Sequence, residues 1–223
     1  MREVFEDYSD EIMESMDSVI DDEVQRKGIT IWALEAKSAI AFCLCCCERL
    51  FLNYAVFSRE SGSGSESKLR KLIDIAWNNL LTGGDNYQAE MHELLDEAGN
   101  FILDEQEHRL AAHAATAISV VELSIGSFNA QPNEFAIECY RLVLQDILRF
   151  VIDDALYSGK SFSSVPDELF ESCFWVEELD LNVKILKLLR GSEYSIGEAI
   201  SEVRSLCINN SASNIGVTGT GSN

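Results

Sequence analysis

The stretch AIAFCLCCCERLFLNYAVF, residues 39–57, decides how this chain folds. From Ala39 to Cys47 every position is apolar, so a helix formed here has no polar face to turn toward water. Such a helix is stable when other helices surround it. The stretch therefore predicts a central helix, spanning about residues 30–59, in the core of a helical protein.

Amphipathic patterns on both sides of this stretch predict the helices that surround it. In each pattern apolar residues recur at spacings of three or four, which places them on one face of a helix. The chain contains only two prolines, so long helices can form without interruption. We therefore predict an all-α fold, a compact bundle of about seven or eight helices around the central apolar helix. The other predicted helices cover about residues 3–27, 66–81, 87–98, 105–127, 133–157, 166–190 and 196–208.

Local signals indicate where several of these helices begin and end. Gly28 is expected to end the first helix, and SGSGS, residues 61–65, is expected to break the second. Pro166, followed by two acidic residues, is expected to open the helix that continues to about residue 190. SIGE, residues 195–198, matches a capping box and predicts the start of the last helix.

The composition divides the chain into three parts. Residues 1–29 form an acidic N-terminal helical extension, residues 30–209 a helical domain, and residues 210–223 a polar C-terminal tail whose end we expect to be mobile. The first thirty residues lack the basic start and apolar core of a signal peptide. No apolar run reaches the roughly 18–20 residues that a membrane span needs. We therefore expect a cytoplasmic protein whose seven cysteines stay reduced.

The chain is strongly acidic, with 38 acidic residues, 17 basic residues and a formal net charge of −21. This charge repels the phosphates of nucleic acids and anionic membrane surfaces, so we expect neither as a partner. It attracts a basic protein, although an acidic surface also simply aids solubility. The candidate partner-binding residues lie in an acidic run, residues 85–107, that contains no Lys or Arg. They are Asp85, Glu90, Glu93, Asp96 and Glu97.

The clustered cysteines raise the question of a metal or redox site. A zinc site usually takes two C-x-x-C pairs, and only one such pair is present, Cys43 with Cys46. On a helix Cys43, Cys46 and Cys47 share one side, while Cys45 points elsewhere. Because buried cysteine packs as a small hydrophobe, we favour core packing over a metal or redox site. The three histidines complete no metal-binding pattern, and we expect neither a metal nor a cofactor.

Charged and polar residues follow the cysteines directly and form the candidate site. Glu48 and Arg49 end the apolar run, where a charge is costly to bury unless it is paired. One interpretation is a polar network with Asn53 and Tyr54 that fixes neighbouring helices. The alternative is a ligand-binding pocket that also includes Asp74, in which Arg49 binds a carboxylate or phosphate and Glu48 acts as a base. No nucleophile elbow, phosphate loop or dinucleotide fingerprint is present, so we assign no catalytic residue.

Five stretches match one protein family in order, and together they span about residues 31–217. The stretches are AFCLCCCERLFLNYAVF at 41–57, KLRKLIDIAWNNL at 68–80, AISVVELSIGSF at 117–128, VPDELFESCFWVEELDLNVKILKLL at 165–189 and SNIGV at 213–217. They resemble the bacterial domain-of-unknown-function family 416 (DUF416), the YjaG-like proteins. The most specific parts are Cys47-Glu48-Arg49, Asn53-Tyr54, Phe57, Asp74 with Trp77, and Ser213-Asn214-Ile215-Gly216.

This resemblance implies a compact, largely helical cytoplasmic protein of bacterial type, and it implies no particular reaction. The chain departs from the family pattern at Leu52, where members usually carry Pro before Asn-Tyr. The acidic extension and the richness of the cysteine cluster are further departures. These differences indicate a divergent member.

Two functional hypotheses follow. The favoured one is a non-enzymatic acidic protein that binds a basic protein partner, for example an immunity or inhibitor protein of a toxin system. The alternative is a small-ligand-binding protein or enzyme with its pocket around the candidate site. A homo-oligomer that pairs its helical faces is a third possibility.

Overall fold

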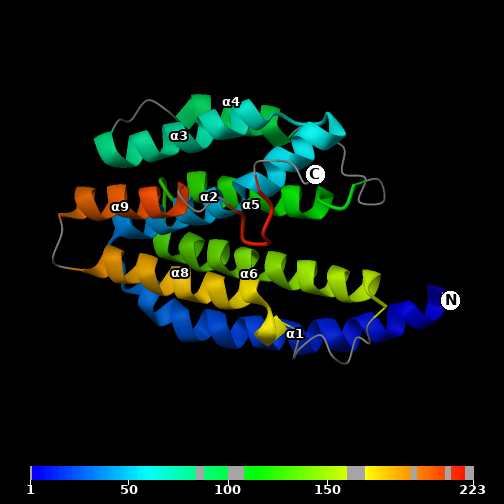
Figure 1. Cartoon of the computed structure of the whole chain (residues 1–223). Coiled ribbons are helices and arrows are strands. Elements are labelled where there is room, and N and C mark those ends of the chain that lie inside the picture. The colour runs from blue at the N-terminus through cyan, green and yellow to red at the C-terminus, as the bar shows by residue number, and fades with distance from the viewer. Residues whose placement is uncertain are drawn as a thin grey trace.

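The structure is a computed structural model that describes residues 2–83, 88–99, 108–159, 169–191, 195–208 and 212–218. These residues form an all-α bundle, which confirms the predicted fold class, and the only β pairing among them is an isolated bridge between Ala212 and Thr218. Figure 1 shows the arrangement of the helices. They are α1 (Arg2–Trp32), α2 (Ala36–Ser61), α3 (Glu66–Thr82), α4 (Gln88–Gly99), α5 (Ala111–Gly126), α6 (Pro132–Tyr157), α8 (Cys173–Arg190) and α9 (Ile196–Ile208).

Helix α2 is the central helix that the quoted stretch predicts. It packs against α3, α5, α6, α8 and α9, and Figure 1 shows it inside the bundle. By length and composition α2 is apolar enough to cross a membrane, but 89% of its most apolar window is buried inside the protein. The apolar character of α2 is therefore explained by its place in the core.

The four thiols of α2 are part of this core. These α2 thiols belong to Cys43, Cys45, Cys46 and Cys47, and all four side chains are buried. Across the interface with α5, Cys47 Sγ lies 3.0 Å from Ser124 Oγ and 3.8 Å from the Val120 carbonyl oxygen. Burial raises the pKa of each α2 thiol well above its ordinary value, so the thiols are protonated at neutral pH.

Helix α1 does not end at Gly28 as the sequence predicts, but continues to Trp32. An added Cβ at Gly28 would meet only Ile137 at 3.8 Å, and Ile31, one turn further on, is fully buried. Asn133 at the start of α6 donates hydrogen bonds to the carbonyl oxygens of Ile31, Trp32 and Leu34. Burial and these bonds outweigh the weak helix-ending tendency of one glycine.

Three other expected helix ends can be compared with the structure. Gly62, in the SGSGS segment, ends α2 with φ +70° as predicted. Ser195 and Glu198 form the predicted capping box, in which Ser195 N donates to Glu198 Oε2 at 2.9 Å. The helix expected over 166–190 is instead interrupted at Ser172, whose backbone is extended, so α8 begins at Cys173. The expected start at Pro166 lies outside the described residues.

Helix α5 begins at Ala111 rather than near residue 105. The reason is local, because two backbone N–H groups at this point donate to His108. His108 Nδ1 accepts a hydrogen bond from Leu110 N at 3.1 Å, and its carbonyl oxygen accepts one from Ala111 N at 3.0 Å.

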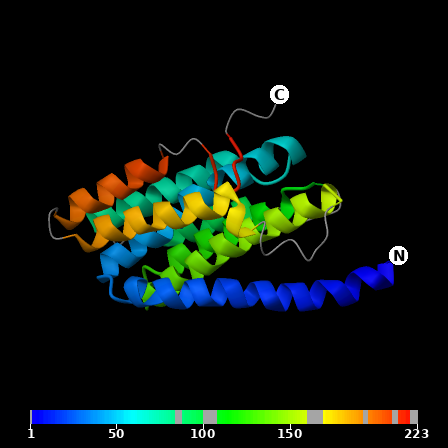
Figure 2. The same cartoon turned by 60° about the horizontal axis from the view of Figure 1, so that its bottom comes forward.

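The acidic N-terminal helix is anchored along α6 at one side of the bundle, as Figure 2 shows. The buried Tyr140 hydroxyl donates to Glu23 Oε1 at 3.0 Å, and Arg26 binds the other oxygen of Glu23. Arg141 forms an ion pair with Asp21. Burial, followed by the neighbouring Glu23 carboxylate, raises the Tyr140 pKa well above its ordinary value.

Part of the C-terminal segment folds into the bundle. Residues 212–218 form a tight loop, and Ser213, Asn214 and Ile215 within it are buried. Asn214 N donates to the carbonyl oxygen of Arg49 in α2 at 3.2 Å. The middle of the segment that the sequence analysis assigns to a polar tail therefore lies against the central helix.

Candidate functional site

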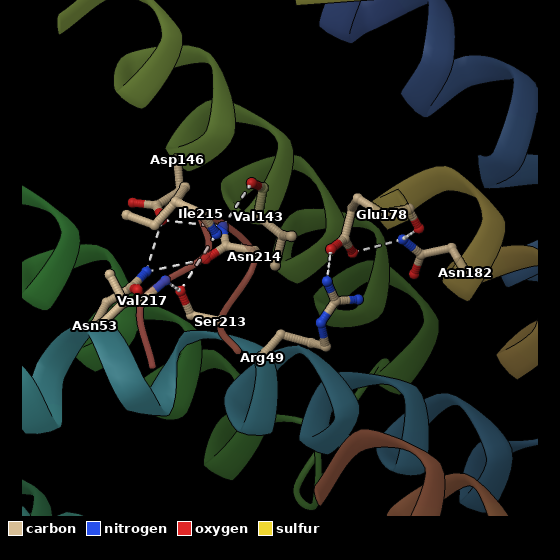
Figure 3. A network of polar contacts seen from close by, with 10 residues as sticks. All are labelled: Arg49, Asn53, Val143, Asp146, Glu178, Asn182, Ser213, Asn214, Ile215 and Val217. Atoms are coloured by element: carbon tan, nitrogen blue, oxygen red, sulfur yellow. Dashed lines mark hydrogen bonds and ion pairs between the residues drawn. The ribbon is translucent and has the colours of Figure 1, made fainter. Parts of the chain in front are cut away.

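A buried carboxylate, Asp146, stands where α2, α5, α6 and the C-terminal loop meet. Its Oδ2 atom accepts hydrogen bonds from Asn53 Nδ2 at 3.1 Å and from Asn214 Nδ2 at 3.0 Å, as Figure 3 shows. Asn53 Nδ2 also donates to Asn214 Oδ1 at 2.9 Å, so the two amides hold each other. The Oδ1 atom of Asp146 lies 2.8 Å from Nδ1 of His113. These contacts fix the orientation of the Asp146 carboxylate, with Oδ2 facing the two amides and Oδ1 facing His113.

This arrangement determines the protonation of the His113 ring. A carboxylate oxygen accepts hydrogen bonds, so the His113 tautomer that fits this contact carries its hydrogen on Nδ1. Nε2 is then an acceptor in the neutral ring and a donor in the charged ring. Within the part of the chain that the structure describes, Nε2 has no hydrogen-bond partner.

His113 lines a groove with a volume of about 890 Å³. The start of α5 forms one wall, the C-terminal half of α6 forms another, and the C-terminal loop closes one side. The charged side chains and histidines that line it are His108, Arg109, His113, Arg149, Asp153 and Asp154. The positive and negative side chains balance at this groove, in a protein whose net charge is −21.

The ring of the second histidine has a defined orientation. Because Leu110 N–H donates to Nδ1 of His108, the ring hydrogen is on Nε2, which lies 3.1 Å from Glu60 Oε2. The ring also packs edge-on against Phe57, with centroids 5.1 Å apart. His108 therefore braces the start of α5 against α2.

The five site residues that the sequence predicts do not share one pocket. Glu48 binds Arg70 through both oxygens, at 2.6 and 2.8 Å, and also accepts from Trp77 Nε1 at 2.9 Å. Asp74 joins this cluster through Arg70 and through Arg204, whose Nη2 lies 2.8 Å from Asp74 Oδ1. Glu48 and Asp74 thus connect α2, α3 and α9.

Arg49 points in another direction, toward α8. It forms a buried ion pair with Glu178, whose Oε1 atom accepts a hydrogen bond from Asn182 at 2.7 Å, as Figure 3 shows. The Arg49 Nε and Nη1 atoms are buried and have no hydrogen-bond partner among the described residues. Glu178 binds one end of the Arg49 guanidinium, and the role of Arg49 in binding a ligand anion stays a prediction.

The remaining predicted site residues are Tyr54 and Asn53. The Tyr54 hydroxyl donates to the Ala98 carbonyl oxygen at 2.7 Å and accepts from Ser65 N at 2.7 Å, so it ties α2 to α4. Burial raises the Tyr54 pKa, and the Ser65 N–H partly offsets this rise. Of the five residues, only Asn53 contributes its side chain to the Asp146 network beside the groove, while Arg49 contributes its carbonyl oxygen.

The predicted partner-binding residues lie on α4 where the structure describes them. Glu90 pairs with Lys71 at 2.8 Å and Glu97 with Lys68 at 2.6 Å, so two of these acids already neutralise lysines of α3. Glu93 and Asp96 are exposed on the outer face of α4. Asp85 lies outside the described residues.

Sequence reasoning did not single out His113 and Arg149, which line the groove, or Asp146, which binds His113. One signal for Asp146 was present: it follows Val143 by three positions and precedes Phe150 by four, which places an acid on the buried face of α6. His113 stands alone in an Ala-rich helix and carries no comparable signal. Among the described residues, no three His, Cys, Asp or Glu side chains come together as a metal site.

Comparisons with known proteins give a consistent relationship. The chain is 26% identical over 189 residues to the uncharacterized protein YjaG of Escherichia coli strain K12, covering 82% of this chain and 92% of that protein. It is 24% identical over 186 residues to the YjaG protein of Salmonella typhimurium, with the same coverage.

A solved structure supports the fold. The crystal structure of a DUF416 family protein from Shewanella baltica covers 86% of this chain and 97% of its own, with a TM-score of 0.75 at 18% identity. Residues 29–218 match the family described as "Protein of unknown function (DUF416)". Since this match spans well over half of the sequence, the chain belongs to the DUF416 family.

Proposed function

We propose that this protein binds a small molecule in the groove formed by α5, α6 and the C-terminal loop. The observation that carries the proposal is the His113–Asp146 pair, a buried and oriented histidine at the wall of a groove of about 890 Å³. Ligand sites are typically concave, with a few fixed polar groups among apolar ones. The apolar lining here includes Val56, Phe150 and Ile215.

The free-energy cost of burying the Asp146 carboxylate supports a binding role. Asp146 is 1% exposed, and a buried carboxylate loses much of its hydration even when it is paired. An apolar residue at this position would pack between α2 and α6 without that cost. A buried carboxylate that binds a groove-lining histidine is one of the few fixed polar groups that ligand sites use.

The proposal is tested by screening small molecules against the full chain with thermal denaturation. A ligand at 100 times its Kd raises the melting temperature by roughly 5–10 °C in a protein of this size. The variant Ala112→Leu narrows the groove, and Ala115→Leu is the matched control, since Ala115 is also half-buried on α5 but does not line the groove.

The expected result is one or more compounds that stabilise the wild type and Ala115→Leu but not Ala112→Leu. If every stabilising compound acts equally on both variants, the groove is not the binding site and the proposal is wrong.

A second proposal rests on the charge of the molecule. We propose that the exposed acidic face of α4, with Glu93 and Asp96, attracts a basic protein partner, as an immunity or inhibitor protein would. The supporting observation is the net charge of −21, which steers a basic partner toward the protein at low salt. We also propose that the protein acts in the cytoplasm, the compartment expected from its sequence.

The partner proposal is tested by affinity capture from a bacterial lysate at low and high salt. The double variant Glu93→Gln/Asp96→Asn is compared with Glu177→Gln/Asp180→Asn, which removes the same charge from the exposed face of α8. We expect one basic protein to bind the wild type and the α8 variant at low salt, and to be lost from the α4 variant. Equal capture by both variants would assign the interaction to net charge rather than to α4.

A further inference from the structure

We infer that the exposed face of α8 is a contact surface for a second copy of this chain. In the pair, the two α8 helices lie antiparallel about a two-fold axis that crosses the helix level with residue 182. This surface is separate from both proposed sites, because α8 packs against α2, α6 and α9, whereas α4 packs against α3 and α5. The α5–α6 groove is likewise formed by other elements. The dimer therefore goes beyond the proposed function.

An apolar stripe runs along the outer side of α8, which Figure 2 shows, in yellow and orange, at the surface of the bundle. Val176 and Val183 are both 48% exposed, and because they are seven residues apart they stand on the same face of the helix. Phe170, shortly before α8, is also exposed. Exposed apolar side chains that share one face and are bordered by charged residues are typical of a protein interaction surface.

The charges on this face are separated along the helix. Glu177 and Asp180 lie in the first half of α8, whereas Lys184, Lys187 and Arg190 lie in its last two turns. All five side chains are exposed. Within the part of the chain that the structure describes, none of the five forms an ion pair. The outer face of α8 thus has an acidic end and a basic end.

The unpaired bases of α8 differ from other exposed bases of this acidic chain. On α3, Lys68 pairs with Glu97 and Lys71 pairs with Glu90, so acids of the neighbouring helix α4 neutralise both lysines. The sequence contains 38 acidic residues, yet no described acid neutralises the three bases at the end of α8. These bases remain available to the acids of another molecule.

The outer face of α8 is complementary to itself. Glu177 and Lys187 are equally far from the two-fold axis along the helix, and so are Asp180 and Lys184. In an antiparallel pair, Glu177 therefore faces Lys187 of the second copy, and Asp180 faces Lys184 of the second copy. The symmetry repeats each contact, which gives four ion pairs. Val183 lies next to the axis, so the valines of the two copies meet at the centre of the contact.

A second copy fits this face better than other macromolecules do. A basic protein meets three unpaired bases here, and the net charge of −21 repels a nucleic acid. The net charge also opposes pairing of two copies, but 0.1 M salt screens charges more than about 10 Å apart, and facing side chains of packed helices are closer than that. One helix from each copy offers less area than the roughly 800 Å² per partner of a standard interface, so we expect a weak, reversible dimer.

A charge swap in the full chain tests this contact. Glu177→Lys/Asp180→Lys makes the α8 face basic, and Lys184→Glu/Lys187→Glu makes it largely acidic. Each variant alone brings like charges together, whereas a mixture of the two restores opposite charges at all four contacts. The two variants change the net charge by equal and opposite amounts, so a mixed pair carries the same total charge as a wild-type pair. Sedimentation equilibrium in about 0.15 M sodium chloride measures the Kd between about 10 µM and 1 mM protein, the range that suits a small interface.

We expect the wild type to dimerise reversibly in this range. Each α8 variant alone should associate at least about tenfold more weakly, because four attractive contacts become repulsive. An equal mixture should form a heterodimer with a Kd within about threefold of the wild-type value, because the number of ion pairs is the same. The control Asp17→Lys/Asp22→Lys makes the same charge change at exposed positions of α1 and should dimerise at least as well as the wild type. Melting temperatures from circular dichroism check that each variant is folded.

The inference is overturned if the wild type stays monomeric up to the highest concentration, if either α8 variant dimerises like the wild type, or if the mixture forms no heterodimer. If the wild type is monomeric and a lysate protein binds it but neither α8 variant, the face binds a different partner and the dimer assignment is wrong. None of these results bears on ligand binding in the groove or on capture by α4, because α8 contributes to neither surface.

Discussion

Gly216 shows how one residue holds the C-terminal loop against the bundle. Its φ of +75° is in the left-handed region, which favours glycine. An added Cβ would lie 2.6 Å from Cε1 of Phe174, far inside a normal contact distance. Phe174 packs edge-on against Phe150, one of the groove residues, at 5.3 Å between centroids. A side chain at position 216 would therefore disturb both the loop and the groove wall.

We expect Gly216→Ala to lower the free energy of unfolding by about 2–3 kcal/mol, from backbone strain and the clash together. Urea denaturation measures this change. The control is Gly197→Ala in α9, where nothing lies within 4 Å of an added Cβ and φ is not positive. That substitution should be neutral or slightly stabilising. Equal stability of Gly216→Ala and wild type would contradict the described loop conformation.

Asp146 is the second residue whose role can be isolated. Asp146→Asn keeps the shape but removes the charge, and it leaves the amides of Asn53 and Asn214 facing a group that is partly a donor. We expect a loss of about 2–4 kcal/mol in the free energy of unfolding. Asp154→Asn, at an exposed position on the same helix, should change it by less than about 0.5 kcal/mol. Similar losses in the two variants would show that Asp146 is not specially bonded.

At the scale of the helices, the sequence predicted elements better than their ends. The uninterrupted apolar run from Ala39 to Cys47 specifies a buried helix because no face of it tolerates water. The capping box at Ser195 is likewise local, because its two partners are three residues apart. The helix end predicted at Gly28 was wrong because the contact that extends α1 comes from Asn133, more than 100 residues later. Local signals cannot include such a contact.

The α2 thiols make the free energy of unfolding depend on pH. Their pKa values are raised in the folded protein, chiefly by burial, and return to about 8.5 when the chain unfolds. Above that pH the unfolded chain releases protons that the folded protein keeps, so the free energy of unfolding decreases as the pH rises. Below about pH 8 these thiols are protonated in both states and contribute no slope.

Urea denaturation between pH 7 and pH 10 checks this expectation. Replacing one of the four thiols, as in Cys46→Ala, should reduce the alkaline slope by the share of one proton, about 1.4 kcal/mol per pH unit where the unfolded thiol is ionised. An alkaline slope that Cys46→Ala leaves unchanged would mean that the α2 thiols do not cause it.

At the scale of the whole molecule, the candidate site depends on contacts that the sequence does not reveal. His113, Asp146 and Asn214 come from α5, α6 and the C-terminal loop, and 101 residues separate the first from the last in sequence number. The sequence predicted Asn53 as a site residue because it lies in the conspicuous α2 segment. Its partners lie in other elements, and only the packing of those elements on α2 brings them together.

The net charge of −21 also acts on the whole molecule. Like charges on one compact surface repel one another, and salt screens this repulsion within about 10 Å at 0.1 M. We expect the melting temperature to rise by several degrees between 0.05 and 0.5 M sodium chloride. Potassium chloride at the same concentrations is the control and should act equally. A falling melting temperature would show that the surface ion pairs, such as Lys71–Glu90, outweigh the repulsion.

The position of Asn214 has a consequence for how the protein is made. Among the described residues, the groups that Asn214 bonds lie on Arg49, Asn53, Val143 and Asp146, which the ribosome synthesises earlier. A nascent chain can therefore assemble α2, α5 and α6 while Asp146 still lacks one of its two amide donors. The groove reaches its final form only when translation has passed residue 214, which makes completion of the site a late event in the life of each new molecule.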